Sequence, residues 1–146
     1  MKQSPLILIG YSVLELSIRA NPNFDSQKPV KMDLSEFAVD SLCTLVNPET
    51  NRWDVVLTLQ HDVNQEKNQP YSFKLHLIGN FEVLKGYPED KRTKLVEVNG
   101  PSILYGIARE IIRSTSAQGP FRSLLLPSVS FYPPKEKENL HEKSMP

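Results

Sequence analysis

The sequence predicts an α+β fold, in which an antiparallel sheet carries a long helix packed on one face. Two segments in the middle of the chain alternate apolar and polar residues around a short polar turn, a pattern typical of a β-hairpin. A later segment repeats apolar residues at intervals of three and four, which is typical of an amphipathic helix. At 146 residues the chain is long enough for one domain with a substantial core.

The first predicted strand runs from Leu6 to Ile18. Residues 6–9 are apolar on both faces, so we expect the helix to cover one face and another subunit to cover the other. Beyond Gly10 the alternation assigns Tyr11, Val13 and Glu15 to one side, and Ser12, Leu14, Leu16 and Ile18 to the other. A signal peptide is the alternative, but no small-residue cleavage site follows and the run is too short to span a bilayer. We therefore expect a cytoplasmic protein without membrane insertion.

Residues 21–33 are rich in turn-forming pairs and predict a crossover loop. Phe24 is the aromatic residue of this loop. An isolated loop aromatic most often packs back onto its own domain, and contact with a substrate is the less frequent alternative. The following segment, to Val46, is ambiguous, although Asp33–Glu36 could begin a helical turn.

The predicted hairpin joins Trp53–Gln60 to Tyr71–Phe81 through the polar turn of residues 65–70. In the second strand, alternation places Phe73, Leu75 and Leu77 on one face, and Lys74, His76 and Ile78 on the other. Gly79 with Asn80 predicts a bulge or the end of the strand, because glycine inside a strand usually marks one of these.

Residues 85–99 are charged and predict a surface loop that leads into a short edge strand or an early helical turn. Gly100–Pro101 then opens the predicted helix, since proline is tolerated in a first helical turn. The apolar stripe of this helix consists of Ile103, Leu104, Ile107, Ala108, Ile111 and Ile112, with Arg109, Glu110 and Arg113 turned away from it. Weak helix formers at 114–116 and Gly119 mark the end of the helix.

The segment Phe121–Phe131 is almost wholly apolar and needs cover from water. Beyond Tyr132 the chain has paired prolines, alternating charges and few apolar residues, too few to offset the entropy of ordering it. We therefore expect a domain at residues 1–132 and a disordered or partner-dependent tail at residues 133–146.

Composition and motifs give little support for catalysis or charge-driven binding. Seventeen basic and seventeen acidic residues leave no net charge, so capture of nucleic acid or an anionic membrane is not expected. Cys43 is the one cysteine and cannot form an internal disulfide. No spacing suits zinc and no glycine-rich phosphate loop occurs, so we expect no metal, no cofactor and no enzyme.

The histidines do not suggest a catalytic pair. Folding the hairpin about Lys67 places His61 opposite a residue near 73, so His61 and His76 are not cross-strand partners. His61 and Asp62 point to opposite faces of a strand, which makes them a poor dyad. A solvated strand histidine is the favoured interpretation of His61.

The helix and the apolar segment after it resemble the SecB family of protein-export chaperones. The matching positions are Pro101, Leu104, Ala108, Arg109, Glu110, Ile112, Gly119, Phe121, Leu124, Leu126, Val129 and Phe131. Residues 29–34 also resemble the end of the family's crossover loop. The chain departs from the family pattern at Gly106, Arg122 and Pro127–Ser128, and Pro133–Pro134 blocks the second helix of the family where it would start.

The resemblance implies a SecB-like fold with a four-stranded antiparallel sheet, assembled as a dimer of dimers. It also implies an ATP-independent holdase that binds non-native polypeptide in hydrophobic grooves. Carried over residue by residue, the peptide-binding set is Phe24, Met32, Leu34, Phe73, Leu75, Phe121, Leu124 and Phe131. Each of these is also interpretable as a core residue, and for any single one the core is the favoured interpretation. The helix residues Ile103, Ile107 and Ile111 are assigned to the core or to the oligomer interface.

The implied clients are unfolded preproteins or the C-terminal segment of an antitoxin, because SecB-like chaperones accompany some toxin–antitoxin systems. The export members of the family use exposed carboxylates to meet the motor SecA. The neutral composition of this chain argues against a standard SecA partnership. An enzyme or a purely structural oligomer with the same fold is the remaining alternative.

Overall fold

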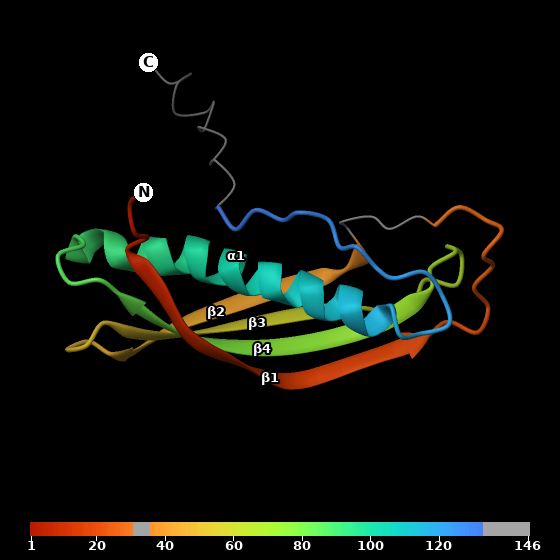
Figure 1. The fold of residues 1–146 in the computed structure, drawn as a ribbon, viewed down its shortest axis with the longest axis horizontal. Coiled ribbons are helices and arrows are strands. Elements are labelled where there is room, and N and C mark those ends of the chain that lie inside the picture. Colours follow the sequence, from red (N-terminus) through yellow and green to blue (C-terminus); the bar gives the residue numbers. More distant parts are fainter. Residues whose placement is uncertain (31–35, 133–146) are drawn as a thin grey trace, which may run out of the picture.

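The computed structural model describes residues 1–30 and 36–132 and confirms the predicted α+β fold. The elements in chain order are β1 (Leu6–Ala20), β2 (Ala38–Asn47), β3 (Arg52–His61), β4 (Tyr71–Val83) and α1 (Glu89–Ser116). The strands form one antiparallel sheet in the order β1-β4-β3-β2, and α1 lies across one face of it (Figure 1). Met32, Leu34, the predicted turn beginning at Asp33 and the predicted tail lie outside the described residues.

The central strands β3 and β4 supply most of the core. They pair without a register shift, and every second side chain of each strand is buried against the helix. The buried apolar residues of the pair are Trp53, Val55, Leu57, Leu59, Tyr71, Phe73, Leu75, Leu77, Phe81 and Val83. The predicted alternation of β4 is therefore confirmed. Burial of this kind stabilises the fold by about 1.5–3 kcal/mol for each large side chain.

Strand β1 contains two bulges that the sequence pattern did not predict. Its register with β4 shifts between Leu8 and Gly10 and again between Val13 and Glu15. Because each bulge adds one residue, the second shift brings Leu16 onto the same face as Val13. The predicted assignment of β1 residues to faces is therefore wrong beyond Val13. The predicted bulge at Gly79 is also wrong: the extra residue opposite this part of β4 belongs to β1.

The ambiguous segment before Val46 forms the edge strand β2, which pairs with β3. Its exposed apolar side chains include Leu42 and Leu45. Cys43 is half-buried beneath the helix, with its thiol 3.9 Å from the carbonyl oxygen of Val96. Burial, together with the nearby charge of Glu97, raises the pKa of this thiol to about 11.

The helix begins at Glu89, about three turns before the predicted start. Pro88 precedes it, and the acidic residues Glu89 and Asp90 occupy its first turn, where carboxylates interact favourably with the helix dipole. Pro101 lies inside the helix and is buried. A Cβ atom at Gly100 would lie 2.9 Å from Val55, so glycine permits the close packing of α1 on β3. The Gly100–Pro101 pair is therefore a packing site and not a helix start.

The segment after α1 runs back along the helix in an extended conformation (Figure 1). Leu124 and Leu126 are buried in the core. The Tyr105 hydroxyl donates to the carbonyl of Pro127, and Arg109 Nε donates to the carbonyl of Leu126 at 2.9 Å. Arg109 is thus half-buried and holds this segment, contrary to the prediction that it faces water.

Candidate functional site

Three loops meet at one end of the molecule, beyond the C-terminal end of α1 (Figure 1). They are the crossover loop (residues 21–30), the hairpin loop between β3 and β4 (residues 62–70) and the post-helix loop (residues 117–122). A hollow of about 500 Å³ lies between the crossover loop and the post-helix loop. We call it the groove; its lining residues are Phe24, Ser26, Lys28, Pro29, Val30, Pro120, Phe121 and Arg122.

Two phenylalanines, one from each wall, form the base of the groove. The ring centroids of Phe24 and Phe121 are 4.7 Å apart at an interplanar angle of 55°, and both side chains are half-buried. Phe121 also contacts the buried ring of Tyr71, with centroids 5.8 Å apart. Tilted aromatic contacts of this kind are favourable beyond the area they bury. The apolar surface of the groove is therefore continuous with the core.

The hydroxyl of Tyr71 fixes the post-helix wall. It accepts a hydrogen bond from the Phe121 N–H at 2.9 Å and lies 3.3 Å from the carbonyl oxygens of Ser116 and Phe121. A Cβ atom at Gly119 would lie 2.3 Å from this hydroxyl. Glycine at position 119 is thus required for the close approach between the loop and the tyrosine.

The hairpin loop fixes the crossover wall through Asn68, in an arrangement that we call the Asn68 clamp. The side-chain oxygen of Asn68 accepts from the Asp25 N–H at 2.9 Å, and its NH₂ group donates to the carbonyls of Asp25 (2.7 Å) and Lys28 (3.2 Å). Nearby, Asn21 donates through its backbone N–H to the carbonyl of Pro70 at 2.8 Å. These bonds bracket Phe24 in sequence and hold it against the post-helix loop.

His61 helps to hold the chain just before β2, at Glu36. Its side chain is 1% exposed, with Nδ1 3.1 Å from the carbonyl oxygen of Glu36 and Nε2 3.1 Å from Gln69 Oε1. Gln69 also donates to the Glu36 carboxylate, which pairs with Lys67. Burial lowers the pKa of His61, although the Gln69 hydrogen bond and the charge of Asp62 oppose this effect. The prediction of a solvated histidine is wrong, because His61 lies on the core face of β3.

The predicted peptide-binding residues divide into four groups. Phe24 and Phe121 meet in the groove, whereas Phe131 lies along the helix, half-buried, with its ring centroid 6.0 Å from that of Tyr105. Phe73, Leu75 and Leu124 are buried in the core of this single chain, and the groove does not use them. Met32 and Leu34 lie outside the described residues.

Sequence reasoning missed the polar and charged contributors to this end of the molecule. They are Lys28 and Arg122 in the groove and Asn68 in the clamp. All three lie in loops without periodic patterns, so a single sequence carries no signal that would connect them.

A second apolar surface, which we call the β1 surface, lies beside the helix. Tyr11, Val13 and Leu16 pair with β4 residues on the helix-facing side, yet they are 47%, 45% and 40% exposed. The half-buried helix residues Ile103, Ile107 and Ile111 lie on the same side of the sheet. Large apolar side chains exposed together in this way are typical of an interaction surface.

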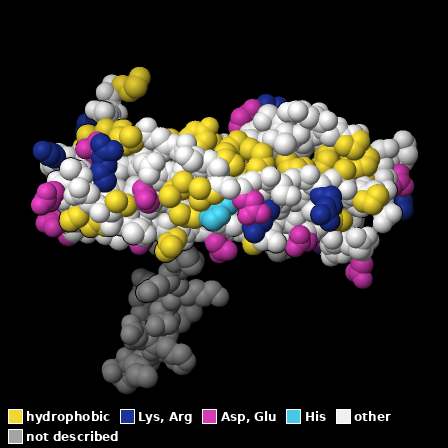
Figure 2. Space-filling model, turned by 90° about the horizontal axis from the view of Figure 1, so that it is seen from below, with side chains coloured by type: hydrophobic (Ala, Val, Ile, Leu, Met, Phe, Trp, Pro, Cys, Tyr) yellow, Lys and Arg dark blue, Asp and Glu magenta, His cyan; other side chains and the backbone are white. Residues whose placement is uncertain are grey.

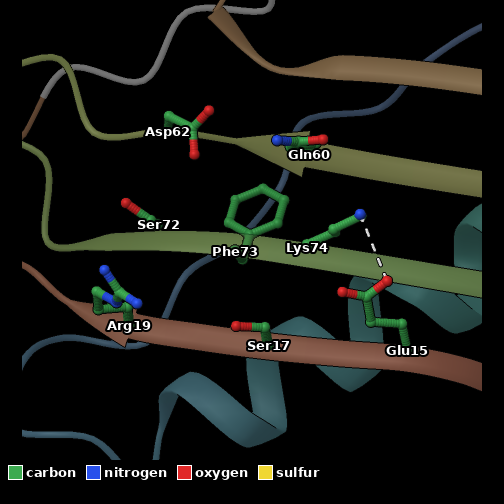
Figure 3. Close-up of a pocket in the computed structure, with 8 residues that line it drawn as sticks. All are labelled: Glu15, Ser17, Arg19, Gln60, Asp62, Ser72, Phe73 and Lys74. Atoms are coloured by element: carbon green, nitrogen blue, oxygen red, sulfur yellow. Dashed lines mark ion pairs between the residues drawn. The ribbon is translucent and has the colours of Figure 1, made fainter.

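The open face of the sheet is mixed in character. Figure 2 shows acidic and basic side chains interspersed there with apolar ones. A hollow of about 260 Å³ near the end of β1 is lined by side chains of both charges, and Lys74 pairs with Glu15 across it at 3.4 Å (Figure 3). Elsewhere on this face Arg52 lies 3.8 Å from Glu82, and Asn80 donates to Asp54 at 2.7 Å. Most of its carboxylates are therefore already engaged by neighbours.

Two kinds of feature are absent from residues 1–30 and 36–132. No group of three or more histidine, cysteine, aspartate or glutamate side chains is arranged to hold a metal ion in this part of the chain. Within the same residues, α1 is not apolar enough to cross a membrane.

The chain matches known proteins over most of its length. Residues 20–134 match the family described as preprotein translocase subunit SecB. The protein-export protein SecB of Rhodopseudomonas palustris is 32% identical over 85 residues, 58% of this chain and 54% of that protein. The corresponding protein of Nitrobacter hamburgensis is 26% identical over 111 residues, 76% of this chain and 69% of that protein. The chain thus spans about half the length of the first relative.

Two solved structures share the fold. A SecB-like chaperone of Mycobacterium tuberculosis, solved with a peptide from an antitoxin, superposes with a TM-score of 0.66 at 13% identity, covering 86% of this chain and 91% of that one. A protein of unknown function from Streptococcus agalactiae gives a TM-score of 0.52 at 14% identity, covering 84% and 97%.

Proposed function

Since the chain belongs to the SecB family, we propose that it is an ATP-independent chaperone, a holdase, that binds extended segments of non-native polypeptide. The groove between the crossover loop and the post-helix loop is the proposed binding site. Its client is an unfolded preprotein on the way to export, and the proposed compartment is the cytoplasm. The SecB family is a family of chaperones and not a class of enzymes, and we propose no catalytic activity for this member.

One observation carries the proposal: Phe24 and Phe121 line a hollow at the surface, and both side chains are only half-buried. A pocket lined by aromatic and aliphatic groups can accept apolar side chains of many shapes, whereas backbone groups of its loops can bind an extended chain. The Asn68 clamp and the Tyr71 hydroxyl hold the two walls in place. Preformed walls reduce the entropy that binding would otherwise lose.

We further propose that the β1 surface joins the subunits into a dimer of dimers. Ile103, Ile107 and Ile111 are only half-buried in the single chain, as residues of a helix that packs against a second copy would be. Tyr11 and Val13 add exposed apolar area beside them. This arrangement would leave the groove open at the end of each subunit.

A stable complex with SecA is not part of the proposal. A partner that recognises exposed carboxylates would meet Glu15 and Glu82 on the open sheet face, and both of these already have basic neighbours. Exposed ion pairs are weak, but each one reduces the local negative potential.

Suppression of aggregation tests the proposed function. A reduced, unfolded model polypeptide is mixed with the purified protein without ATP, and light scattering gives both the turbidity and the mass of the complex. We expect the wild-type protein to prevent aggregation as a tetramer. The variant Phe24→Ser/Phe121→Ser should lose most of this protection, whereas Leu42→Ser, which alters an exposed leucine on β2, should keep it. Equal loss in both variants, or no protection by the wild type, would contradict the proposal.

A dedicated antitoxin chaperone is the second candidate function. The M. tuberculosis protein with this fold was solved with an antitoxin peptide, which favours this alternative for a chain of similar architecture. A dedicated chaperone would bind one short sequence tightly and would protect the unfolded model polypeptide only feebly. The aggregation assay, combined with a titration of antitoxin peptides, therefore distinguishes the two functions.

A further inference from the structure

The two charged side chains that line the groove are both positive. Lys28 comes from the crossover wall and Arg122 from the post-helix wall, and no carboxylate of the described residues lines the hollow. Lys28 and Arg122 are exposed, and neither forms an ion pair with any residue of the ranges that the structure describes. The groove thus combines an apolar base with two unneutralised cations.

Among the residues that the structure describes, the two carboxylates nearest to the groove in sequence, those of Asp25 and Glu36, have partners within the protein. Asp25 Oδ1 accepts the Gln27 N–H at 2.9 Å within the crossover loop. Shortly before β2, the Glu36 carboxylate is bound by Gln69 and Lys67. This local excess of positive charge contrasts with the chain as a whole, which has equal numbers of acidic and basic residues.

Charge at this position selects among apolar ligands. A peptide that places an aromatic or aliphatic side chain in the groove, against the contacting rings of Phe24 and Phe121, brings its neighbouring residues beside Lys28 and Arg122. Peptide carboxylates at these positions are attracted to the two cations, whereas peptide lysines are repelled by them. Each such pair is partly exposed, so its contribution is modest and falls with ionic strength.

From this arrangement, and resting on the proposed function, we propose that the groove selects acidic apolar segments, in which an aromatic or large aliphatic residue is flanked by aspartate or glutamate. Basic segments of equal hydrophobicity are bound more weakly. The apolar base supplies most of the affinity, and the two cations supply the discrimination between clients.

Three synthetic peptides with one shared apolar centre test the proposal. Their flanking residues are glutamate, serine or lysine, and binding to the full-length protein is measured by fluorescence anisotropy. At low salt we expect the glutamate peptide to bind roughly 5–30-fold more tightly than the lysine peptide, because its carboxylates form exposed ion pairs with the two cations, whereas the lysines are repelled by them. Raising the salt from about 0.05 M to about 0.5 M should reduce this ratio, because the Debye length shortens.

Substitutions connect the preference to the two cations. In Lys28→Gln/Arg122→Gln, the affinities for the glutamate and lysine peptides should lie within about twofold of each other, because the charges that distinguish the two peptides are gone. The matched control is Arg19→Gln, which removes an exposed arginine that lines the separate hollow on the open sheet face. It should leave the ratio unchanged.

The outcomes distinguish failure of the proposed peptide site from failure of the proposed charge preference. If none of the peptides binds, the groove is not a peptide site, and the proposed function fails together with the preference. If all three bind equally, or if the lysine peptide binds best, the groove binds peptides but the charge preference is wrong. An effect of Arg19→Gln equal to that of the double variant would also overturn the role of Lys28 and Arg122.

Discussion

The groove and the β1 surface are both apolar and both lie outside the core, but they are built differently. The groove is concave, and its walls are irregular loops held by side-chain hydrogen bonds from Asn68 and Tyr71. The β1 surface consists of a hydrogen-bonded strand, with two bulges, and a helix, and its exposed apolar side chains follow the strand. Such a surface suits a symmetric partner that presents the same surface, whereas a concave site between loops suits a chain of variable sequence.

The largest expected effect comes from placing a charge on the β1 surface. Val13→Asp should convert the oligomer to a smaller species and weaken self-association more than about 100-fold, because a buried unpaired carboxylate costs several kcal/mol. Leu42→Asp, at an exposed leucine on the other edge strand, is the control and should keep the native mass by light scattering. Since all groove residues come from one chain, the Val13→Asp protein should still bind a peptide. A tetramer of unchanged stability would show that the β1 surface is not the interface.

The second prediction concerns the post-helix wall. Gly119→Ala should displace the Tyr71 hydroxyl and destabilise the fold by about 1–3 kcal/mol, because the added Cβ has no room. Gly106→Ala is the matched control: no atom lies within 4 Å of its added Cβ, and an exposed helical site should be stabilised by about 0.5–1 kcal/mol. Urea denaturation measures both variants, and equal stability would contradict the close packing at Gly119.

The third prediction concerns the crossover wall. Asn68→Ala removes three hydrogen bonds to Asp25 and Lys28, and peptide affinity should fall roughly 3–10-fold as this wall loses its fixed position. The control, Asn64→Ala, lies in the same loop and removes only a local bond to the Glu66 N–H. In a Phe24→Ala background, Asn68→Ala should have little further effect, because the clamp acts through Phe24. Additive losses would mean that Asn68 only supports the fold.

The smallest expected effect is the dependence of stability on pH at His61. Burial lowers the pKa of His61 below its ordinary value of 6.5, so the unfolded chain binds the proton more readily than the folded chain. The free energy of unfolding should therefore decrease as the pH falls below about 6.5. In His61→Gln this part of the decrease should disappear, whereas His76→Gln, on the open sheet face, should retain it. Parallel pH profiles for the wild-type protein and His61→Gln would contradict the assignment.

The sequence predicted the regular parts of the fold well, because they depend on periodic patterns. The alternation of Phe73, Leu75 and Leu77 correctly identified the core face of β4. Two local features made predictions wrong, one for the faces of β1 and one for the start of α1. The bulges of β1 shifted its alternation, and Pro101 suggested a helix start although the helix was already three turns long. Tertiary packing allows the bulges in β1 and the proline inside α1, and a local sequence pattern carries no information about that packing.

The candidate site was less predictable than the fold. Phe24 and Phe121 were named from the sequence, and they do meet in the groove. Phe73, Leu75 and Leu124 were named on the same grounds but are buried in the core. A single sequence does not distinguish an apolar residue of the core from one that lines a groove. The polar contacts of Asn68 and the burial of His61 join residues about 25 to 43 positions apart, and no pattern in a single sequence records such contacts.

Hydrogen exchange with a bound client tests the central claim most directly. The full-length protein is incubated with a reduced, unfolded model polypeptide, and amide exchange is compared with that of the free protein. Exchange should become slower in both walls of the groove, at residues 21–30 and 117–122, and should stay unchanged in β2. Protection confined to the sheet, with both loops exchanging as in the free protein, would contradict the account.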